Sequence, residues 1–561
     1  MEEKIRELEA EIADLPSGYI SRKNIRGKIQ HYYQWTEAGK KRSKYVDDSY
    51  AEELTAAIEK RRALQNKLKE MKKNLPKAKP ARQQEYFRTN VLTGDALKKF
   101  VEPVKALKRR DCYSVLEDFF EESQSGKLLI LYGLRRTGKT TLMRQVIASF
   151  SDLQKTAFIQ VSPGISLGDI NSDLKLCSEK GYQNIFIDEA TLAEDFIEGS
   201  ALFSDIYAAS GMKIVLSGTD SLGFLFAKSE ELYDRCIMLH TTWIPYREFD
   251  RVLGITGIDE YIRFGGTMSI GGKHYNPTFY SKESTDEYID SAIAKNIQHS
   301  LRFYQDGGHF RNLADLFDKN ELTSAINRVI EDINHRFTVD VLTKDFISHD
   351  LGVSNGLRRV LEILNKNEQS IKITNAHRIE IKEYLDLLDL TVDIPTEFIP
   401  VRNEKAFKTA ISQPGLRYSQ AQALISQLLL DEEFQNISAV DRAWISERIL
   451  NEIRGRMMED IVLLETKISC PQKHVFRLQF AVGEFDMVVV DPAKITSEIY
   501  EIKHSTERTA EQYKNLVDSE KCSATEFRYG KIIRKAVIYR GENAVDGDIE
   551  YLNVEDYLKS V

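Results

Sequence analysis

The sequence contains few cysteines and no long apolar run. Its five cysteines are scattered along 561 residues without a C-x-x-C pair, so we expect neither a disulfide framework nor a zinc site, and we infer a reducing compartment. There is no apolar run of about 18 residues and no signal-peptide segment. Together these absences predict a cytoplasmic protein that makes no membrane contact.

Charge is unevenly distributed along the chain. The net charge is -8, yet residues 1–110 carry 27 Lys and Arg against 16 Asp and Glu, and the excess of acidic residues lies in the remainder. A basic arm on an acidic body is typical of a nucleic-acid contact, and equally of a lysine-rich helix that docks on that body. The length predicts about three or four domains, because single cores rarely exceed ~250–300 residues.

Residues 1–80 are predicted to form the basic arm. Apolar residues at three- and four-residue spacing predict helices over 1–15 and about 47–75. Glycine-containing turns divide residues 19–46 into three predicted strands. We expect the helices to pair as an antiparallel coiled coil with the small sheet at its tip. Such an arm could hold a protein partner or support self-association.

Aromatic residues alternate with basic ones in this small sheet. The aromatic residues are Tyr19, Tyr32, Tyr33, Trp35 and Tyr45. Exposed rings can stack on bases while Lys and Arg meet phosphates. The same rings could instead pack one face of a sheet that has no other core. Both interpretations stay open at this point.

A glycine-framed loop follows the apolar segment 128–132. It has the pattern G-x-x-x-x-G-K-T, in which backbone N–H groups cradle phosphates, Lys139 reaches the β- and γ-phosphates, and the Thr140 hydroxyl binds Mg²⁺. The residues predicted to bind the nucleotide are Gly133, Leu134, Arg135, Arg136, Thr137, Gly138, Lys139, Thr140 and Thr141.

Five apolar segments alternate with helical ones after residue 125. They are 128–132, 156–162, 184–188, 213–217 and 236–240, and they predict a parallel sheet covered on both faces. The third ends in Asp188-Glu189, where Asp188 can hold Mg²⁺ and Glu189 can act as general base toward water. The fourth is expected to lie between the first and third, which would bring Ser217 or Thr219 near the γ-phosphate.

Three arginines are candidates for stabilising transition-state charge. Arg135 and Arg136 lie within the glycine-framed loop, and Arg235 lies just before the fifth predicted strand. Each could equally be a surface or interface residue.

In order, these motifs resemble the prokaryotic archaeal-type AAA+ ATPases related to the STAND group. The resemblance covers residues 85–275 and includes the segments Pro245-Tyr-Arg-Glu-Phe249 and Tyr261-Ile-Arg-Phe-Gly265-Gly266. It implies an AAA+-like P-loop domain that uses ATP and Mg²⁺. It also implies a helical, winged-helix-like region over 276–400, which could read DNA or pack as a lid. Amphipathic patterns in this region predict helices over 320–341, 355–366 and 378–390, the last of which ends before Thr391-Val-Asp-Ile-Pro395.

A second set of polar residues lies in the predicted α/β domain 401–561. Asp486 is on one strand, and Glu501 and Lys503 project together from the next because alternate residues share a face. Two carboxylates that hold Mg²⁺ beside a lysine suit phosphodiester hydrolysis, and Glu459 on the preceding helix could complete the metal shell. The layout resembles the PD-(D/E)XK nuclease fold.

The sequence therefore predicts an α/β multidomain ATPase. Its nucleotide state would control a C-terminal nuclease-like domain that acts on DNA. The alternative is a nucleotide-dependent switch that binds a protein or nucleic-acid partner without cutting it.

Overall fold

The computed structural model describes residues 11–12, 15–25, 28–37, 40–73, 86–122, 126–219, 223–224, 228, 231–267, 293, 310–318, 321–326, 328–330, 332–333, 373–402, 405–436 and 438–561. The chain divides into two compact units, Met1–Tyr86 and Phe87–Val561, and each is described by itself. Among the described residues, no helix is long and apolar enough to cross a membrane.

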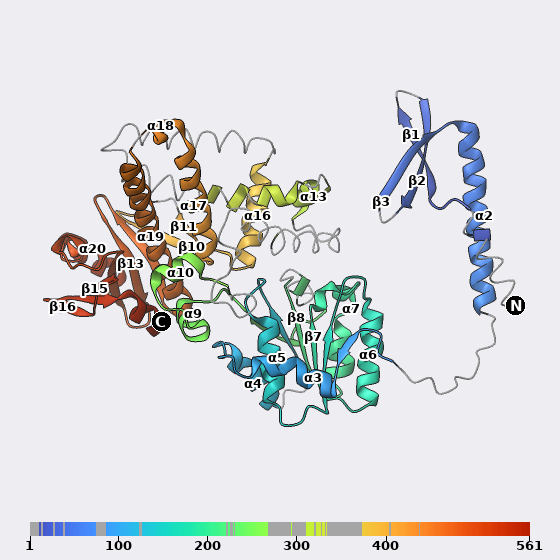
Figure 1. Ribbon diagram of the computed structural model, residues 1–561, viewed down its shortest axis with the longest axis horizontal. Coiled ribbons are helices and arrows are strands. Elements are labelled where there is room, and N and C mark those ends of the chain that lie inside the picture. The colour runs from blue at the N-terminus through green and yellow to red at the C-terminus, as the bar shows by residue number, and fades with distance from the viewer. Residues whose placement is uncertain are drawn as a thin grey trace. The chain divides into compact units, whose positions relative to one another are not determined.

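The first unit is a three-stranded antiparallel sheet with a helix on one face (Figure 1). As predicted, the strands β1 (Tyr19–Ile25), β2 (Lys28–Glu37) and β3 (Lys40–Val46) precede a helix, α2 (Asp48–Lys73). Ile20 and Tyr33 of the sheet pack near Leu54 of α2 in the core of this unit. The predicted helix over 1–15 falls mostly outside the described residues, so its pairing with α2 stays a prediction.

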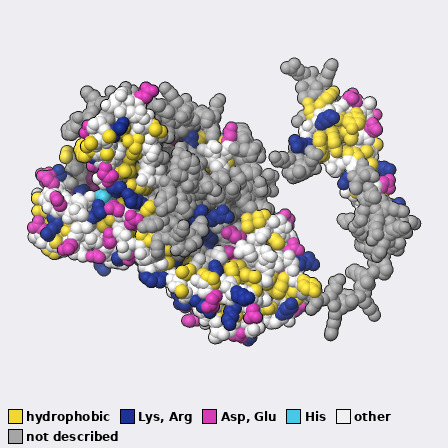
Figure 2. Space-filling model, in the orientation of Figure 1, with side chains coloured by type: hydrophobic (Ala, Val, Ile, Leu, Met, Phe, Trp, Pro, Cys, Tyr) yellow, Lys and Arg dark blue, Asp and Glu magenta, His cyan; other side chains and the backbone are white. Residues whose placement is uncertain are grey.

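The aromatic residues of this sheet divide between its two faces. Tyr33 belongs to the core and stacks on Trp35 at a centroid distance of 4.8 Å. Tyr19 and Tyr45 adjoin core residues in sequence, so they point to the opposite face, and they are 53% and 56% exposed. Tyr32 lies opposite Tyr45 in the register, with their rings 5.8 Å apart. Side chains of the hydrophobic class, which includes tyrosine, gather on this unit in Figure 2.

The second unit begins with a six-stranded sheet in the order β4-β6-β7-β8-β5-β9. Its edge strand β4 (Asn90–Leu92) is antiparallel to β6, and the other pairs are parallel. The parallel strands are β5 (Leu128–Tyr132), β6 (Thr156–Gln160), β7 (Asn184–Asp188), β8 (Lys213–Gly218) and β9 (Cys236–His240). They coincide with the five predicted segments, and β8 lies between β5 and β7 as predicted.

Helices cover both faces of this sheet. One face packs against α3 (Gly94–Val101), η1 (Glu102–Val104), α4 (Tyr113–Glu121) and α5 (Lys139–Ser149). The other packs against α6 (Leu167–Glu179), η2 (Ala190–Leu192), α7 (Phe196–Gly199) and η3 (Phe203–Ala208). Alternation along β5 explains this, because Leu129 and Leu131 enter one core and Leu128 and Ile130 enter the other.

The two helices after β9 belong to a different core. Residues of α9 (Tyr246–Leu253) and α10 (Ile258–Phe264) pack with residues of the C-terminal helices and sheet in one hydrophobic cluster. The last two helices of the predicted nucleotide domain, 85–275, therefore pack in the C-terminal core and not on the six-stranded sheet. The sequence analysis named segments of both helices only through the family resemblance, which did not show which sheet they would cover.

The described elements of 276–390 are helical. α13 (Arg311–Asp318) and α16 (Asn375–Leu387) contribute to a cluster that also contains Leu134 of the glycine-framed loop. Most of the predicted helices over 320–341 and 355–366, and with them the predicted winged helix, fall outside the described residues. The predicted helix 378–390 is present as α16.

The C-terminal part is an eight-stranded mixed sheet in the order β11-β10-β12-β13-β14-β15-β17-β16. Its strands are β10 (Thr391–Ile399), β11 (Ala406–Ile411), β12 (His474–Phe480), β13 (Glu484–Asp491), β14 (Thr496–Lys503), β15 (Lys531–Tyr539), β16 (Ala544–Asp546) and β17 (Ile549–Asn553). Its helices are α17 (Pro414–Leu430), α18 (Glu432–Gln435), α19 (Ala439–Ser469), η8 (Ala510–Tyr513), α20 (Ser519–Tyr529) and α21 (Val554–Ser560).

This sheet begins before residue 401, where the sequence predicted the domain boundary. The segment 391–395 was predicted to follow the end of a helix, and no strand was predicted there. In the structure Pro395 lies within β10 and pairs with Phe407 of β11, while the pairing with β12 starts only at Thr396. A proline is tolerated there because its missing N–H is not needed on the β12 side.

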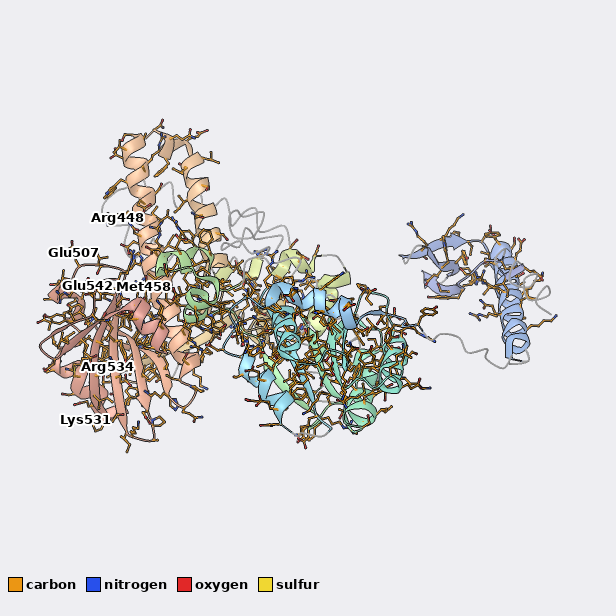
Figure 3. All side chains as sticks on the ribbon, turned by 60° about the horizontal axis from the view of Figure 1, so that its bottom comes forward. Arg448, Met458, Glu507, Lys531, Arg534 and Glu542 are labelled. Atoms are coloured by element: carbon orange, nitrogen blue, oxygen red, sulfur yellow. The ribbon has the colours of Figure 1, made fainter. Side chains whose placement is uncertain are left out.

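The carboxyl ends of β14 and β15 lie at the same edge of the sheet. These strands are parallel neighbours, and Lys503 lies opposite Tyr539. Figure 3 shows Lys531, the first residue of β15, at one end of this sheet and Glu507 and Glu542 at the other. Residues that follow the two strands are thereby brought together.

Candidate functional site

The glycine-framed loop connects β5 to α5 in the predicted strand–loop–helix order. Gly133 and Gly138 have φ of 138° and 89°, a region that favours glycine. A Cβ on Gly133 would lie 2.3 Å from the carbonyl oxygen of Thr241, so only glycine fits against this neighbouring backbone. Inside the loop, the Thr137 hydroxyl donates to the Leu134 carbonyl at 2.8 Å. The loop conformation is therefore fixed by its own sequence and by the residues after β9.

Lys139 is buried at the start of α5. Its Nζ donates to the carbonyl oxygens of Gly133 and Leu134, at 2.8 Å each. Burial lowers the pKa of Lys139 to about 8, although Glu189 and Asp188 act in the opposite direction. The ammonium is thus held at the loop and desolvated, which strengthens its attraction for a phosphate.

Asp188 and Glu189 lie at the carboxyl end of β7, as predicted. Asp188 accepts hydrogen bonds from the hydroxyls of Thr140 (2.8 Å) and Ser217 (2.7 Å). Glu189 accepts from the backbone N–H and the hydroxyl of Thr219, at 3.2 Å each. The structure therefore brings Thr140, both acids and the polar residues of β8 into one site.

Glu189 has an unusual backbone and a perturbed carboxyl. Its φ is 55°, in the left-handed region that non-glycine residues rarely adopt and that is often found at functional sites. Burial raises the pKa of Glu189, although the nearby Lys139 opposes this shift. A raised pKa brings a carboxyl closer to the range in which a general base works.

The three arginines proposed to stabilise transition-state charge lie at different distances from the glycine-framed loop. Arg235 adjoins the start of β5, because its carbonyl accepts the N–H of Leu128 at 2.9 Å, and its guanidinium pairs with Asp205 at 3.3 Å. The loop lies at the opposite end of β5, so Arg235 does not reach the nucleotide site of its own chain. Arg135 lies close enough to affect the pKa values of Lys139 and Glu189, and Arg136 has φ of 67°.

Arg110 is a buried arginine that the sequence did not single out. Its Nε donates to Glu248 at 2.5 Å, and its guanidinium also donates to the carbonyls of Thr137 (2.8 Å) and Trp243 (3.2 Å). It thereby joins the glycine-framed loop to α9. The sequence signal was only the doublet Arg109-Arg110 before a helix, which is indistinguishable from a surface pair.

The C-terminal sheet brings together Asp486, Glu501 and Lys503, as predicted. Lys503 Nζ lies 2.8 Å from Asp486 Oδ2 and 2.6 Å from Glu501 Oε2. The β13–β14 pairing ends at Met487 and Tyr500, and beyond it Asp486 accepts the backbone N–H of Ile502 at 2.8 Å. The Asp486 side chain thus accepts a backbone N–H of β14 beyond the point where β13 and β14 stop pairing.

The two carboxylates strongly affect each other and the lysine. Burial and the neighbouring Asp486 raise the pKa of Glu501 to about 8. Burial would lower the pKa of Lys503, but Asp486 and Glu501 outweigh it and raise that pKa. The ammonium of Lys503 is therefore held between the buried carboxylates of Asp486 and Glu501. Its positive charge offsets the repulsion between them.

Glu459, the third residue of the predicted metal set, is surrounded by cations. Its carboxylate pairs with Lys408 at 2.9 Å and with Arg456 and Arg477 at 3.3 Å each. Burial opposes its ionisation, but these cations hold its pKa well below the usual range. In the described part of the chain, no three His, Cys, Asp or Glu side chains are grouped to hold a metal ion. The predicted metal set of Glu459, Asp486 and Glu501 stays a prediction, and in the structure three cations pair with Glu459.

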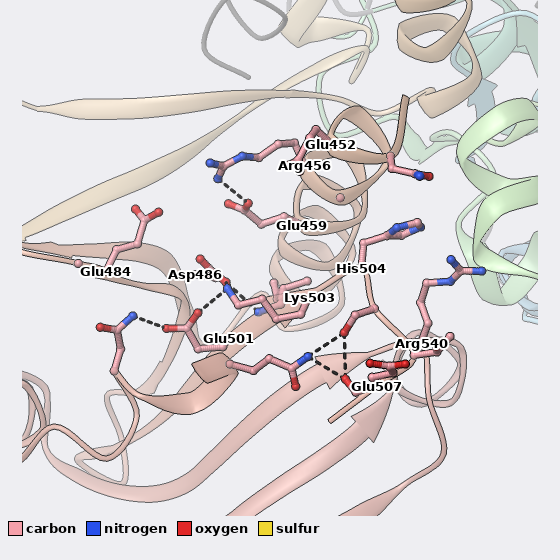
Figure 4. A pocket seen from close by; sticks show the side chains of 18 residues that line it. Glu452, Arg456, Glu459, Glu484, Asp486, Glu501, Lys503, His504, Glu507 and Arg540 are labelled. Atoms are coloured by element: carbon pink, nitrogen blue, oxygen red, sulfur yellow. Dashed lines mark hydrogen bonds and ion pairs between the residues drawn. The ribbon is translucent and has the colours of Figure 1, made fainter. Parts of the chain in front are cut away.

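Glu459, Asp486, Glu501 and Lys503 line one cleft of about 820 Å³ (Figure 4). α19 contributes Arg456 and Glu459 to it, and Asp486, Glu501 and Lys503 come from β13 and β14. His504 and Arg540 also line the cleft, and in Figure 4 they lie on the side that faces the green helices. The lining carries both charges, which suits a substrate with anionic groups and a cation.

Comparisons with known proteins agree with the geometry of the first site. Residues 125–250 match the family model described as an AAA domain, and residues 1–56 match that of a domain of unknown function, DUF6788. Among solved structures, the chain is similar to the Orc1 protein of Aeropyrum pernix in complex with DNA, with 14% identity over 56% of this chain and 92% of that chain. The TM-score is 0.19, so we base no conclusion on this likeness.

No curated protein matches the chain. The match over 125–250 contains the glycine-framed loop, Asp188 and Glu189, which the structure brings into one site. This part of the chain is an AAA-type P-loop nucleotide-binding domain.

Proposed function

We propose that the chain hydrolyses ATP and that its nucleotide state controls the C-terminal cleft, which cleaves DNA. The observation that carries this proposal is the shared core of α9 and α10 with the C-terminal helices and sheet. Those two helices follow β9 directly, so a change at the nucleotide site can reach the C-terminal domain through packed elements.

In the nucleotide site, each residue has a defined role. Backbone N–H groups of 133–141 hold the phosphates, Lys139 contacts the β- and γ-phosphates, and Glu189 takes a proton from the attacking water. Thr140 and Asp188 would hold Mg²⁺. Their hydroxyl and carboxylate oxygens lie 2.8 Å apart, and both are hard oxygen ligands of the kind that this ion prefers. When bound, Mg²⁺ neutralises charge on the phosphate oxygens.

In the C-terminal cleft, Asp486 and Glu501 would hold a divalent cation. The residues fit it, because the ammonium of Lys503 already lies within 2.8 Å of both carboxylates and so occupies a position that attracts positive charge. When bound, the cation would polarise a phosphodiester oxygen. Lys503 would orient the attacking water, and Arg456, which lines the cleft and pairs with Glu459, would attract the phosphate backbone. This layout resembles the PD-(D/E)XK nucleases.

The test is cleavage of DNA by the purified full-length protein. Wild type is incubated with DNA, Mg²⁺ or Mn²⁺, and with or without ATP, beside Asp486→Ala and Lys139→Ala. The exposed Asp548 supplies a matched control, Asp548→Ala. We expect wild type and the control to cleave, Asp486→Ala to be inactive, and Lys139→Ala to lose the response to ATP. Equal, negligible cleavage by wild type and Asp486→Ala would refute the nuclease.

A second candidate is a nucleotide-dependent switch that binds without cutting. The observation that favours it is the saturation of Glu459 by three cations and the absence, among the residues described, of a three-carboxylate group. Its test is the effect of nucleotide on self-association and on binding of DNA. If Lys139→Ala leaves every such association unchanged, the switch is refuted.

Nucleic acid is also the partner that we propose for the first unit. Tyr19, Tyr32 and Tyr45 share the face of the sheet opposite α2, and two of them are more than half exposed. Bases can stack on exposed rings, and the excess of Lys and Arg over residues 1–110 favours a polyanion.

A further inference from the structure

Asp259 of α10 is shared between two side chains of the C-terminal cleft. Its Oδ1 lies 2.9 Å from His504 Nε2, and its Oδ2 lies 2.6 Å from a guanidinium nitrogen of Arg540. The hydrogen bond from His504, reinforced by Arg540, lowers the pKa of Asp259 although burial opposes the shift. Each carboxylate oxygen therefore serves a different segment of the C-terminal domain.

Those two segments are the continuations of β14 and β15. His504 directly follows Lys503, and Arg540 directly follows Tyr539, which lies opposite Lys503 in the parallel register. The backbone N–H of Arg540 also donates to the carbonyl of Ser505 at 2.9 Å. Asp259 thus ties two neighbouring strand ends together, one residue beyond the lysine that contacts Asp486 and Glu501. Figure 4 labels His504, Arg540 and Lys503.

On its other side, α10 is connected to the glycine-framed loop by contacts through α9. Arg110 links the Thr137 carbonyl to Glu248 of α9. The ring of Tyr261 on α10 packs edge-on against Tyr246 and Phe249 of α9 at centroid distances of 5.5 and 5.2 Å. A displacement of the loop therefore has a route of packed and hydrogen-bonded groups to Asp259.

We propose that Asp259 is the positioning residue through which the nucleotide domain sets the geometry of the C-terminal cleft. It acts by holding His504 and Arg540, and thereby the end of β14 that carries Lys503. Arg540, aimed along the cleft edge, is the group whose availability to a substrate phosphate changes when Asp259 moves. This inference rests on the proposed function, because it names the residue that mediates the proposed control.

The test compares two aspartates that make similar ion pairs across the same interface. Asp259→Asn weakens the link to the cleft. Asp250→Asn is the matched control, because Asp250 of α9 pairs with Lys559 of α21 at 3.0 Å and does not line the cleft. Metal-dependent DNA cleavage is measured with and without ATP on the full-length chain, and Asp259→Glu tests rescue. ATP turnover of each variant checks that the nucleotide domain is folded.

We expect ATP to change wild-type cleavage by a factor within the roughly 5- to 150-fold range of typical couplings. In Asp259→Asn this factor falls to about 1 while ATP turnover continues, and Asp250→Asn keeps the wild-type factor. By linkage, DNA should change ATP affinity in wild type but not in Asp259→Asn.

The inference is overturned if Asp259→Asn responds to ATP like wild type, or if Asp250→Asn loses the response equally. These outcomes differ from failure of the proposed function, in which wild type itself shows no cleavage and no effect of DNA on ATP affinity.

Discussion

The hydroxyl of Thr140 donates a hydrogen bond to Oδ2 of Asp188 across 2.8 Å. This contact joins the first turn of α5 to the end of β7. Thr140 and Asp188 are separated by 47 intervening residues, which include the whole of β6 and α6. It depends on the order of strands in the sheet, because only β8 separates β5 from β7. A metal ion held by both residues would therefore sense the position of α5 relative to the sheet.

Thr140→Val should weaken binding of ATP in the presence of Mg²⁺. Valine keeps the shape of threonine but removes the hydroxyl, so we expect the affinity to fall by roughly 10- to 100-fold, as for loss of ~1.5–3 kcal/mol in a contact with a charged group. Titration with a fluorescent ATP analogue, in Mg²⁺ and in EDTA, measures the effect. The control is Thr525→Val, which removes a buried hydroxyl of α20 that bonds only within its helix. An equal loss of affinity in EDTA would contradict a role in metal binding.

Glu189→Gln should separate binding from hydrolysis. The amide keeps an oxygen that can accept from Thr219 but cannot take a proton from water, so turnover should fall by roughly 10²- to 10⁴-fold. ATP affinity should stay within about twofold of wild type, because a general base stabilises the transition state of hydrolysis and contributes little to binding of ATP in the ground state. Steady-state phosphate release and equilibrium nucleotide binding measure the two quantities. Glu179→Gln, at the end of α6, is the matched control, and a turnover drop of the same size in this variant would exclude a specific role for Glu189.

The sequence predicted those features that follow from local periodicity and from one contiguous motif. The five strands from β5 to β9 needed only apolar runs of five residues. The pairing of Glu501 with Lys503 followed from the alternation of a strand, and their ion pair of 2.6 Å confirms that they share a face. The site at Asp188 followed from the strand order of a P-loop sheet.

Features that depend on distant packing could not be predicted. The three cations that pair with Glu459 come from β11, β12 and its own helix, and no local pattern relates them. Arg110 and Asp259 each make their important contacts with residues more than a hundred positions away, apart from Thr137. β10 was not predicted, because a proline argues against a strand. In the structure Pro395 pairs with β11 only, and the pairing of β10 with β12 starts one residue later, at Thr396.

Replacing Tyr19 and Tyr45 together by serine should weaken binding of single-stranded nucleic acid by the full-length chain. Both rings are more than half exposed on the face opposite α2, so their removal should not disturb the core formed by Ile20 and Tyr33. Each stacked base contributes ~1–3 kcal/mol, so an affinity loss of at least about tenfold is expected. Fluorescence anisotropy with a labelled oligonucleotide at fixed salt measures it. Tyr50→Ser is the control, because Tyr50 is 47% exposed but lies on α2.

If the double variant binds as tightly as wild type at the same salt concentration, the exposed tyrosines do not stack on bases. A loss of the same size in Tyr50→Ser would indicate a general effect on the unit instead of a face-specific one.

Glu465 should make stability fall as pH rises toward neutrality. This residue of α19 is buried, and its Oε1 accepts the N–H of Tyr246 at 2.8 Å, at the junction between α9 and the C-terminal core. Burial raises the pKa of Glu465 to about 7 from its ordinary value of 4.5, although the Tyr246 hydrogen bond opposes the shift. Between these two pH values the folded state binds more protons than the unfolded state.

The sign follows from proton linkage. Where the folded state holds the extra proton, the free energy of unfolding decreases with rising pH, and it becomes level above the folded pKa. The stability that the protonated Glu465 gives is therefore fully present below about pH 4.5. Between about pH 4.5 and 7 the free energy of unfolding falls by ~3 kcal/mol, from 1.36 kcal/mol per pH unit, and above pH 7 it stays at this lower level.

Glu465→Gln should remove this pH dependence. Glutamine can still accept the N–H of Tyr246 but does not titrate, so the difference in stability between variant and wild type should grow in favour of the variant from pH 4.5 to 7 and then stay constant. Denaturant midpoints at several pH values measure the difference, in which groups common to both proteins cancel. Glu447→Gln, an exposed position of the same helix, should show no such trend. Parallel curves for wild type and Glu465→Gln would show that Glu465 is ionised in the folded protein throughout this range, and that the junction tolerates a buried charge.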